Sequence, residues 1–170
     1  ASLTGHLVFS TLHTNDAASA VTRLVDMGIE PYLVSSCLEG IVAQRLVRRV
    51  CSACRKEGAP DPEILEEITT LFPQRIKEAK FYESHGCPRC NFTGYKGRIA
   101  IFEIMVIDAT LRNMIVHQHT STELRNAAIT NGLITLRQDG WMRVLDGVTT
   151  IDEVRRVARK IDFAYKPPAA

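Results

Sequence analysis

The sequence predicts an α/β fold in which a four-cysteine metal-binding insert precedes a C-terminal helical subdomain. Three observations carry this prediction: an apolar run of β-forming residues at 3–12, two C-x-x-C pairs, and several short helical periods in the last third of the chain. A strand that is apolar along its whole length is normally buried on both faces and needs neighbouring strands. No parallel partner follows it along the chain, so we expect an α/β fragment of a larger domain.

Composition favours a folded chain and names no partner. The 170 residues are 45% hydrophobic and 24% charged, which is close to the average of globular proteins. The formal net charge of +2 lacks the basic excess that is typical of nucleic-acid-binding domains, so we expect no nucleic-acid partner. No apolar run approaches the ~20 residues of a membrane helix, and no secretory leader pattern opens the sequence. Paired cysteines in such a chain predict metal binding in the cytosol.

Helical periodicity follows the first apolar run. Asn15 or Asp16 is expected to cap a helix that ends at Gly28. Pro31 is expected to open a second helix that continues to about Val50. The lone Cys37 lies on the apolar stripe of that helix, which favours a role in packing.

The four paired cysteines predict a structural zinc site. Cys51 and Cys54 form one pair, and Cys87 and Cys90 form the other. The C-x-x-C spacing lets two thiolates meet one ion, and two such pairs complete a tetrahedron, leaving no position for water or substrate. Two alternatives stay open: redox-active or simply buried thiols, and a Cys3His shell in which His85 replaces one cysteine.

The rest of the chain is read as an excursion, a strand and a helical subdomain. Residues 57–80 are polar with a weak helical pattern, and Lys96–Ile107 reads as a strand. The pairs Thr135/Gln138 and Thr150/Glu153 fit capping boxes. The expected helices of the subdomain are 109–118, 122–131, 136–146 and 151–160.

Two histidines flank the first apolar run. His6 and His13 are an odd number of residues apart, so on one strand they face opposite sides unless the chain bends. His13 falls where the strand gives way to a polar loop. Ligands of open α/β sheets bind beyond the carboxyl ends of the strands, so this loop is a candidate binding loop.

These residues also carry a family resemblance. The segment Leu3-Thr-Gly-His-Leu-Val-Phe-Ser-Thr-Leu-His-Thr-Asn-Asp-Ala17 resembles the histidine box of the secretion ATPase superfamily. The cysteine pairs resemble the tetracysteine insert of its type II secretion and type IV pilus assembly (extension) branches. The other matching segments, in the family's order, are Arg23–Gly28, Ala43–Arg48 and Thr93–Arg98.

The resemblance implies a role in a molecular machine. The family's members are hexameric cytoplasmic ATPases that act on an inner-membrane platform, which implies a RecA-like (P-loop NTPase) core, ATP and Mg in the full-length protein, and neighbouring subunits and platform proteins as partners. It implies a location in the bacterial cytoplasm, peripheral at the inner membrane, with His6 and His13 as catalytic box histidines. The implied division is 1–50 as part of the RecA-like core, 51–107 as the zinc-binding subdomain, 108–163 as the helical subdomain and 164–170 as a tail.

One departure from the family limits what this chain does alone. It has no G-x-x-x-x-G-K-[ST] phosphate loop, so we expect no ATP hydrolysis by this fragment. The competing interpretation is a free-standing zinc-ribbon module that binds nucleic acid or protein. A basic stretch at Arg45, Arg48, Arg49, Arg55 and Lys56 would suit such a ligand, but acidic residues follow directly, which favours intramolecular pairing or a subunit contact.

Overall fold

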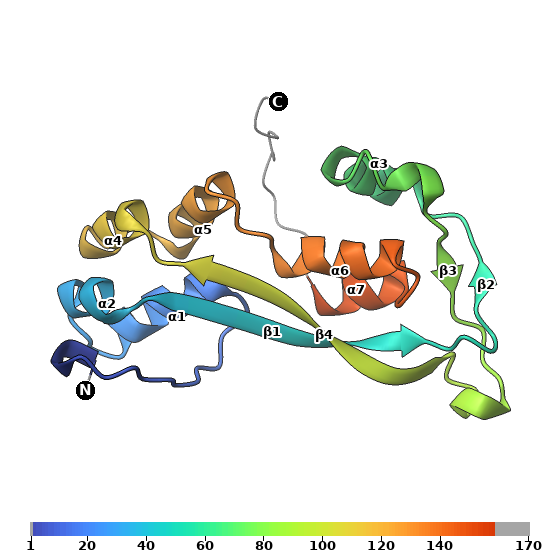
Figure 1. The fold of residues 1–170 in the computed structure, drawn as a ribbon, viewed down its shortest axis with the longest axis horizontal. Helices are drawn as coiled ribbons and strands as arrows, with labels where there is room; N and C mark the ends of the chain where they lie inside the picture. Colours follow the sequence, from blue (N-terminus) through green and yellow to red (C-terminus); the bar gives the residue numbers. More distant parts are fainter. Residues whose placement is uncertain (1, 159–170) are drawn as a thin grey trace. The chain divides into compact units, whose positions relative to one another are not determined.

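Residues 2–158 are described by a computed structural model, in which they form two compact units (Figure 1). The first unit contains residues 2–44 and 102–135, and the second contains residues 45–101 and 136–158. The long strands β1 (Gly40–Val50) and β4 (Tyr95–Val106) pair with each other, and each passes from one unit into the other. Each unit combines two segments of the chain, so the division into continuous segments stays a prediction. The tail at 164–170 lies outside the described residues.

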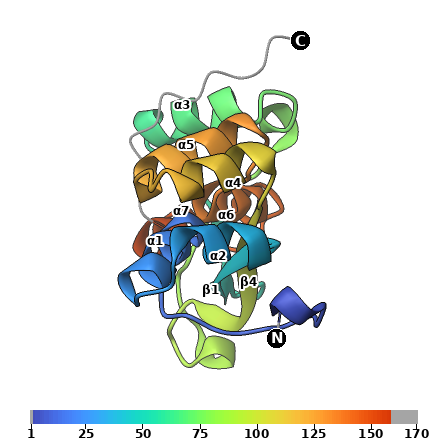
Figure 2. The same cartoon turned by 90° about the vertical axis from the view of Figure 1, so that its left-hand side faces the viewer.

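The first unit is a small helical layer on one end of this strand pair. Helices α4 and α5 pack against α2 and α1 (Figure 2). The apolar side chains between them are fully buried, among them Val21, Leu111 and Leu124. Burial alternates along β4, so that Met105 faces the core and Ile104 faces solvent. The helices are α1 (Ala17–Asp26), α2 (Pro31–Cys37), α4 (Ala109–Val116) and α5 (Ser121–Thr130).

The first helix begins and ends where the sequence predicts. The Asp16 side chain accepts a hydrogen bond from the Ser19 N–H at 2.8 Å and forms an ion pair with Arg125 of α5 at 2.6 Å. Burial raises the pKa of the Asp16 carboxyl, but the hydrogen bonds from Ser19 and Arg125 and the charge of Arg125 outweigh burial and hold the pKa below its ordinary value. Gly28 follows the helix with φ of +88°, a conformation that glycine adopts without strain.

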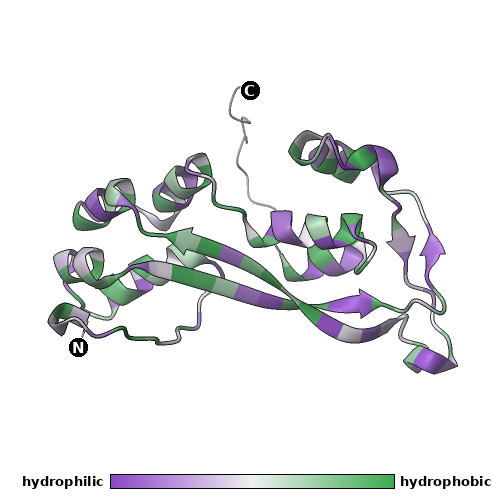
Figure 3. Cartoon of the chain, viewed as in Figure 1, coloured by the Kyte–Doolittle hydropathy of each residue, from purple (hydrophilic) through white to green (hydrophobic). Residues whose placement is uncertain are grey.

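The expected buried strand at 3–12 is wrong for this structure. A short 3-10 turn, η1 (Ser2–Thr4), is followed by backbone without regular structure up to the start of α1. Leu7 is 78% exposed and Phe9 is 88% exposed. Figure 3 colours the residues of the chain by hydropathy and shows hydrophobic residues in this segment. A strand exists only when its N–H and C=O groups meet a neighbouring strand. Within residues 2–158, this segment belongs to neither of the two sheets.

The expected helix from Pro31 to Val50 is half wrong. It begins at Pro31 but ends at Cys37, and residues from Gly40 onward form β1. The apolar residues 41, 42, 46, 47 and 50 are compatible with either period, but this segment is rich in β-branched residues. Pairing with β4 decides between the two, and Val47 is fully buried while Leu46 is half exposed.

The second unit contains the helices α6 and α7 together with residues 45–50 of β1 and 95–101 of β4. Gly140 of α6 lies so close to α7 that an added Cβ would fall 2.7 Å from the Val154 Cγ1. The buried core of this unit includes Ile68, Ile101 and Trp141. Its elements besides the long strands are β2 (Lys56–Glu57), α3 (Pro62–Leu71), η2 (Ile76–Glu78), β3 (Tyr82–Glu83), η3 (Pro88–Cys90), α6 (Leu136–Leu145) and α7 (Ile151–Val157). The antiparallel pair of β2 and β3 matches Lys56 with Glu83 and Glu57 with Tyr82.

The polar excursion at 57–80 is docked through α3. Ile64 and Ile68 are buried, and the Glu67 carboxylate receives hydrogen bonds from two groups of α6. Arg137 donates to it through Nε and Nη2 at 2.7 and 2.8 Å, and the Trp141 indole N–H donates at 2.8 Å. A bidentate guanidinium and a buried indole together fix the position of α3 on α6.

A buried carboxylate holds α7 against β1. Glu153 is completely buried and accepts hydrogen bonds from Arg48 at 2.6 and 2.9 Å and from Arg156 at 2.7 and 3.0 Å. Thr150 caps α7 as predicted, accepting from the Glu153 N–H, but the Glu153 carboxylate binds arginines rather than completing the predicted capping box. The Tyr95 hydroxyl, 2.8 Å from the Thr150 Oγ1, extends this network, and its ring lies 4.0 Å from the Arg48 guanidinium carbon.

The C-terminal helices follow the prediction closely. Three of the expected helices, at 109–118, 122–131 and 136–146, are confirmed within two residues at each end. The fourth is described as far as Val157, and residues 159 and 160 lie outside the described chain. None of the helices in residues 2–158 has the length and apolar character needed to cross a membrane.

The capping box of α5 gives a testable contribution to stability. Thr120 accepts from the Glu123 N–H, and the Glu123 carboxylate accepts from the Thr120 N–H at 2.8 Å. We expect Thr120→Ala to lower the free energy of unfolding by about 1 kcal/mol, because it leaves a helix N–H without its partner. Thr130→Ala, at the other end of α5, is the matched control and should change it by less than about 0.5 kcal/mol. Urea unfolding of both variants measures the difference, and equal effects would contradict the assignment.

Candidate metal centre

The four paired cysteines meet at one point. The Sγ atoms of Cys51, Cys54, Cys87 and Cys90 all lie within 4.8 Å of one another. The Cys51–Cys87 sulfur distance is 3.9 Å, and the Cys54–Cys90 and Cys87–Cys90 distances are 3.8 Å. Zinc with four sulfurs at about 2.3 Å requires sulfur separations of about 3.8 Å, so the cluster has the dimensions of a tetrathiolate zinc site.

Backbone N–H groups are directed at the sulfurs. The Gly86 N–H donates to Cys54 at 3.3 Å, while the Cys87 and Gly94 N–H groups donate to Cys90 at 3.2 and 3.3 Å. Such bonds stabilise thiolates and hold them in the orientation that a metal needs. Gly94 has φ of +77°, and an added Cβ there would lie 2.6 Å from the Ser84 Cβ, so glycine is required at this turn.

The thiols of the site differ in acidity. Burial raises the pKa of Cys54 to about 11, with the neighbouring cysteines contributing in the same direction. Burial also acts on Cys90, but the N–H groups of Cys87 and Gly94 outweigh it and lower the pKa of Cys90 to about 6. Cys90 is therefore more acidic than Cys54, and a divalent cation is a group that would favour ionisation of the Cys54 thiol.

The Cys3His alternative to a tetrathiolate fits less well, whereas the alternative of free thiols stays open. All five cysteines are free, and the sulfur distances of the cluster are far longer than a disulfide bond. His85 is exposed, and among the described residues it does not belong to the cluster of potential metal ligands that the four cysteines form. Cys37 lies half-buried at the end of α2 and outside the cluster. Four sulfurs fill a tetrahedral shell, so the site is suited to a structural cross-link.

The position of the cluster explains what such a cross-link would hold. Cys51 directly follows β1, and Cys90 closes the short turn that precedes β4. The site therefore joins the two ends of the excursion that carries β2, α3 and β3. Cys51 is 3% exposed and Cys90 is 6% exposed, so these two sulfurs are shielded from solvent.

The two predicted histidines lie elsewhere. His6 and His13 are both exposed on the segment that precedes α1, in the first unit, whereas the cysteines belong to the second. The His6 Nδ1 lies 3.0 Å from the Thr4 Oγ1. Neither histidine is among the lining residues of the two cavities described below, and their catalytic role stays a prediction.

Sequence reasoning missed a carboxylate beside the histidine loop. Glu103 of β4 is 1% exposed and accepts a hydrogen bond from the Ala17 N–H at 2.9 Å, at the first residue of α1. A carboxylate stabilises a helix N-terminus through its free N–H groups and dipole. The signal was present, because Glu103 occupies a core-facing position in the alternation of Ile101 to Met105.

Comparisons with known proteins identify relatives of the chain. The type IV pilus assembly ATPase PilB of Thermus thermophilus is 50% identical over 162 residues, which is 95% of this chain and 18% of the relative. The type II secretion system protein E of Pseudomonas aeruginosa is 46% identical over 160 residues, 94% of this chain and 31% of the relative. The chain thus spans less than a third of the length of these curated relatives.

A solved structure shares the fold. The crystal structure of the pilus retraction motor PilT with bound ADP superposes with a TM-score of 0.57, covering 92% of this chain and 34% of that one at 20% identity. This likeness establishes a common α/β fold. A family model described as "Type II/IV secretion system protein" matches residues 1–156. By that match and by the identity to the relatives, this chain belongs to the type II/IV secretion system protein family.

Proposed function

We propose that this chain is the zinc-bearing C-terminal portion of a hexameric cytoplasmic ATPase that powers type II protein secretion or type IV pilus or pseudopilus assembly. The observation that carries the proposal is the sulfur tetrahedron of zinc dimensions in a chain of this family. Its relatives include proteins named as a type IV pilus assembly ATPase and as a type II secretion system ATPase. The share of those relatives that this chain covers supports a role as one portion of such a protein.

The first unit contributes to a RecA-like core in this proposal. Its apolar segment with Leu7, Val8 and Phe9 is exposed here, and burying such side chains stabilises a fold by about 1.5 to 3 kcal/mol each. We infer that the remainder of the core supplies strands that cover this segment. His6 and His13 flank this segment, and in this proposal ATP and Mg bind next to His13 in the full-length protein.

The second unit supplies a rigid junction. Cys51, Cys54, Cys87 and Cys90 would hold one zinc ion per chain, which supplies a cross-link and no open coordination position. With the excursion tied at both ends and α3 bound to α6 through Glu67, the unit can pass displacements on without deforming. Its proposed partners are neighbouring subunits of a homo-hexamer and the inner-membrane platform proteins, at the cytoplasmic face of the membrane.

Activity measurements on two lengths of the protein test this function. We expect the full-length protein to hydrolyse ATP with Mg and the 170-residue chain to hydrolyse none, because its sequence lacks a phosphate loop. In the full-length protein, His13→Ala should lower kcat by about 100-fold, as expected for a group that acts on the reacting phosphate. His117→Ala on the exposed end of α4 is the matched control and should leave kcat unchanged. Hydrolysis by the short chain, or full turnover without His13, would contradict the respective part of the proposal.

A further inference from the structure

Arg49 and Arg55, in the basic stretch beside the first cysteine pair, form no ion pair with the described acidic residues that follow it. Of its members, Arg48 is paired with Glu153 at 2.6 Å. Arg49 forms no ion pair with a carboxylate of residues 2–158, and three of the acidic residues that follow the stretch are paired with other cations. Those pairs are Glu57 with Lys80 at 2.7 Å, Asp61 with Arg155 at 3.3 Å and Glu67 with Arg137 at 2.7 Å.

Two arginines of this stretch, Arg49 and Arg55, line one cavity together with two cations from later in the chain. It has a volume of about 470 Å³ and lies wholly within the second unit, between the first cysteine pair, the start of β4 and the loop after α6. Four cationic side chains line it, three of them arginines. Its one carboxylate, Asp146, is already paired with Arg75 at 2.6 Å and lies 3.8 Å from Arg143. The four cations are Arg49, Arg55, Arg89 and Lys96.

One cation of the cavity, Arg55, is held in place by contacts within the protein. The Arg55 guanidinium lies 3.9 Å above the Tyr82 ring and donates from Nη1 to the Gly147 carbonyl at 2.7 Å. Stacking and a backbone hydrogen bond fix the plane of this guanidinium while leaving other N–H groups available. Arg89 and Lys96, by contrast, are exposed and form no ion pair within the described chain. The site therefore offers one hydrogen-bond donor with a fixed orientation, Arg55, and two donors that can adjust to the ligand, Arg89 and Lys96.

The cysteine cluster accounts for only part of this positive charge. Cys51 lines the cavity, and four thiolates with one divalent zinc carry a formal charge of two minus. Four cations outweigh that charge, since Asp146 is already neutralised by arginines outside the lining. A surplus of positive charge therefore remains in the cavity even with the metal in place.

We propose that this cavity binds a phosphate group. A phosphate monoester carries about 1.5 to 2 negative charges on one centre, with three acceptor oxygens, which suits several cations gathered around one cavity. Guanidinium groups match the geometry of phosphate oxygens, and the Ser52 hydroxyl lines the same cavity as a neutral donor. A single carboxylate would leave most of these donors unused. All residues of the site belong to the second unit, whereas the segment with His6 and His13 belongs to the first.

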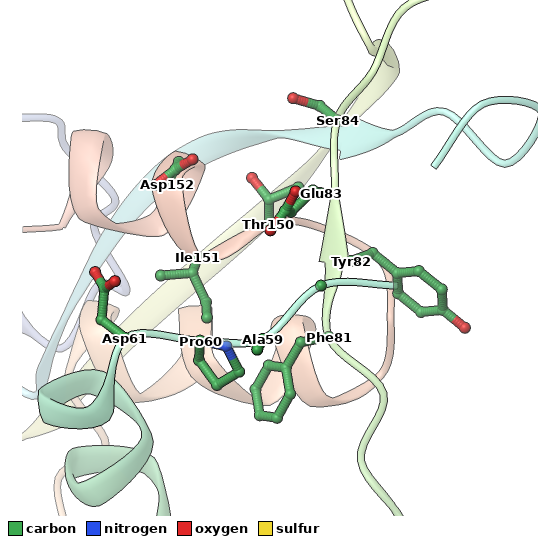
Figure 4. Close-up of a pocket in the computed structure, with 11 residues that line it drawn as sticks. Ala59, Pro60, Asp61, Phe81, Tyr82, Glu83, Ser84, Thr150, Ile151 and Asp152 are labelled. Carbon is green, nitrogen blue, oxygen red and sulfur yellow. The ribbon is translucent and has the colours of Figure 1, made fainter. Parts of the chain in front are cut away.

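A second cavity in the same unit provides an internal contrast. It has a volume of about 290 Å³, and its charged lining residues are all acidic (Figure 4). Figure 4 shows these carboxylates beside the apolar groups of Pro60, Phe81 and Ile151. Phosphate is expected to avoid this cavity. The acidic residues are Asp61, Glu83 and Asp152.

The test is a titration of the zinc-loaded 170-residue chain with inorganic pyrophosphate, monitored by NMR of the backbone amides. We expect the amide chemical shifts of Ser52 and Gly147 in the basic cavity to change and that of Ser84 in the acidic cavity to stay the same. The Arg89→Gln/Lys96→Gln double variant should bind at least about tenfold more weakly, because it removes two charged hydrogen-bond donors from the cavity. Arg98→Gln/Lys77→Gln removes the same charge at exposed sites outside the cavity and should leave the affinity unchanged.

Further arms identify the source of the phosphate. The chain is sedimented with phosphatidylglycerol vesicles and, separately, with phosphatidylcholine vesicles. If it sediments only with the former, and the Arg89→Gln/Lys96→Gln variant does not, the result would support the site with a lipid headgroup as its ligand. Pyrophosphate binding without vesicle binding would support it with a free phosphate compound. If hexaglutamate shifts these amides and pyrophosphate does not, the proposal is overturned in favour of an acidic peptide. If no anion binds and the variant only loses zinc faster, the cations serve the metal and the proposal is overturned.

Discussion

Replacing Cys90 with serine should unfold the second unit under conditions in which the first unit stays folded. Cys90 is buried and accepts two backbone N–H groups, and its sulfur is one vertex of the tetrahedron. Serine cannot replace a thiolate as a zinc ligand, and the binding free energy of a structural zinc, about 10 to 16 kcal/mol for whole sites, is folding free energy. We expect the loss of one ligand to destabilise the unit by an amount on the order of 5 kcal/mol.

Amide hydrogen exchange on the 170-residue chain measures this effect unit by unit. Protection should fall in β3, α6 and α7 while the amides of α1 and α5 keep theirs. Removing zinc with a chelator should produce the same pattern, together with the release of one zinc and four reactive thiols per chain. Cys37→Ser is the matched control, because Cys37 lies outside the cluster and its loss should leave protection intact. Unchanged protection after chelation would show that the excursion is held without metal.

The second large effect is expected at Glu153. Replacing it with glutamine should lower the free energy of unfolding by about 3 kcal/mol, because breaking a buried pair typically costs about 3 to 5 kcal/mol. The lower end applies here, since the side chains of Arg48 and Arg156 are 41% and 59% exposed and can be rehydrated. Asp152→Asn on the same helix is the control and should have an effect below about 0.5 kcal/mol. Urea unfolding of the three proteins measures the difference.

The same residue predicts how stability depends on pH. Burial raises the pKa of Glu153, but hydrogen bonds from Arg156 and Arg48 outweigh it and lower the pKa from 4.5 to about 2. Because the pKa in the folded state is lowered, the contribution is complete above pH 4.5 and is lost as pH falls toward 2. The Glu153→Gln variant should therefore lose less stability than the parent chain over this interval. Urea unfolding at several pH values measures this difference. If the free energies of unfolding of the two proteins fell equally between pH 4.5 and 2, the role assigned to this carboxylate would be contradicted.

Local signals in the sequence predicted the helical part of the fold well. As expected, Asp16 caps the start of α1, Gly28 follows its end and Thr150 caps the start of α7. These signals are predictable because the residues that start and end a helix act on neighbours within one helical turn. The cysteine cluster was predictable for the same kind of reason, since C-x-x-C spacing fixes the local geometry of each half.

Contacts between distant segments were not predictable in this way. The apolar residues of β1 fit the helical period as well as the strand period, so the sequence predicts a helix there, and only the pairing with β4 decides for a strand. Glu103 binds a helix start 86 residues away, and Glu153 binds an arginine 105 residues away. The cavity lined by Arg49, Arg89 and Lys96 depends on where the acidic residues find their partners, which charge order along the chain does not determine.

The docking of α3 on α6 has a spectroscopic consequence. Trp141 is the one tryptophan of the chain, it is completely buried, and its indole N–H donates to Glu67 of α3. Its emission therefore reports selectively on the second unit. Detachment of α3 would expose the indole to water and shift the emission maximum to longer wavelength, whereas events confined to the first unit would leave the spectrum unchanged. The chain thus carries a native fluorophore that distinguishes loosening of the excursion from unfolding of the segment that bears the histidines.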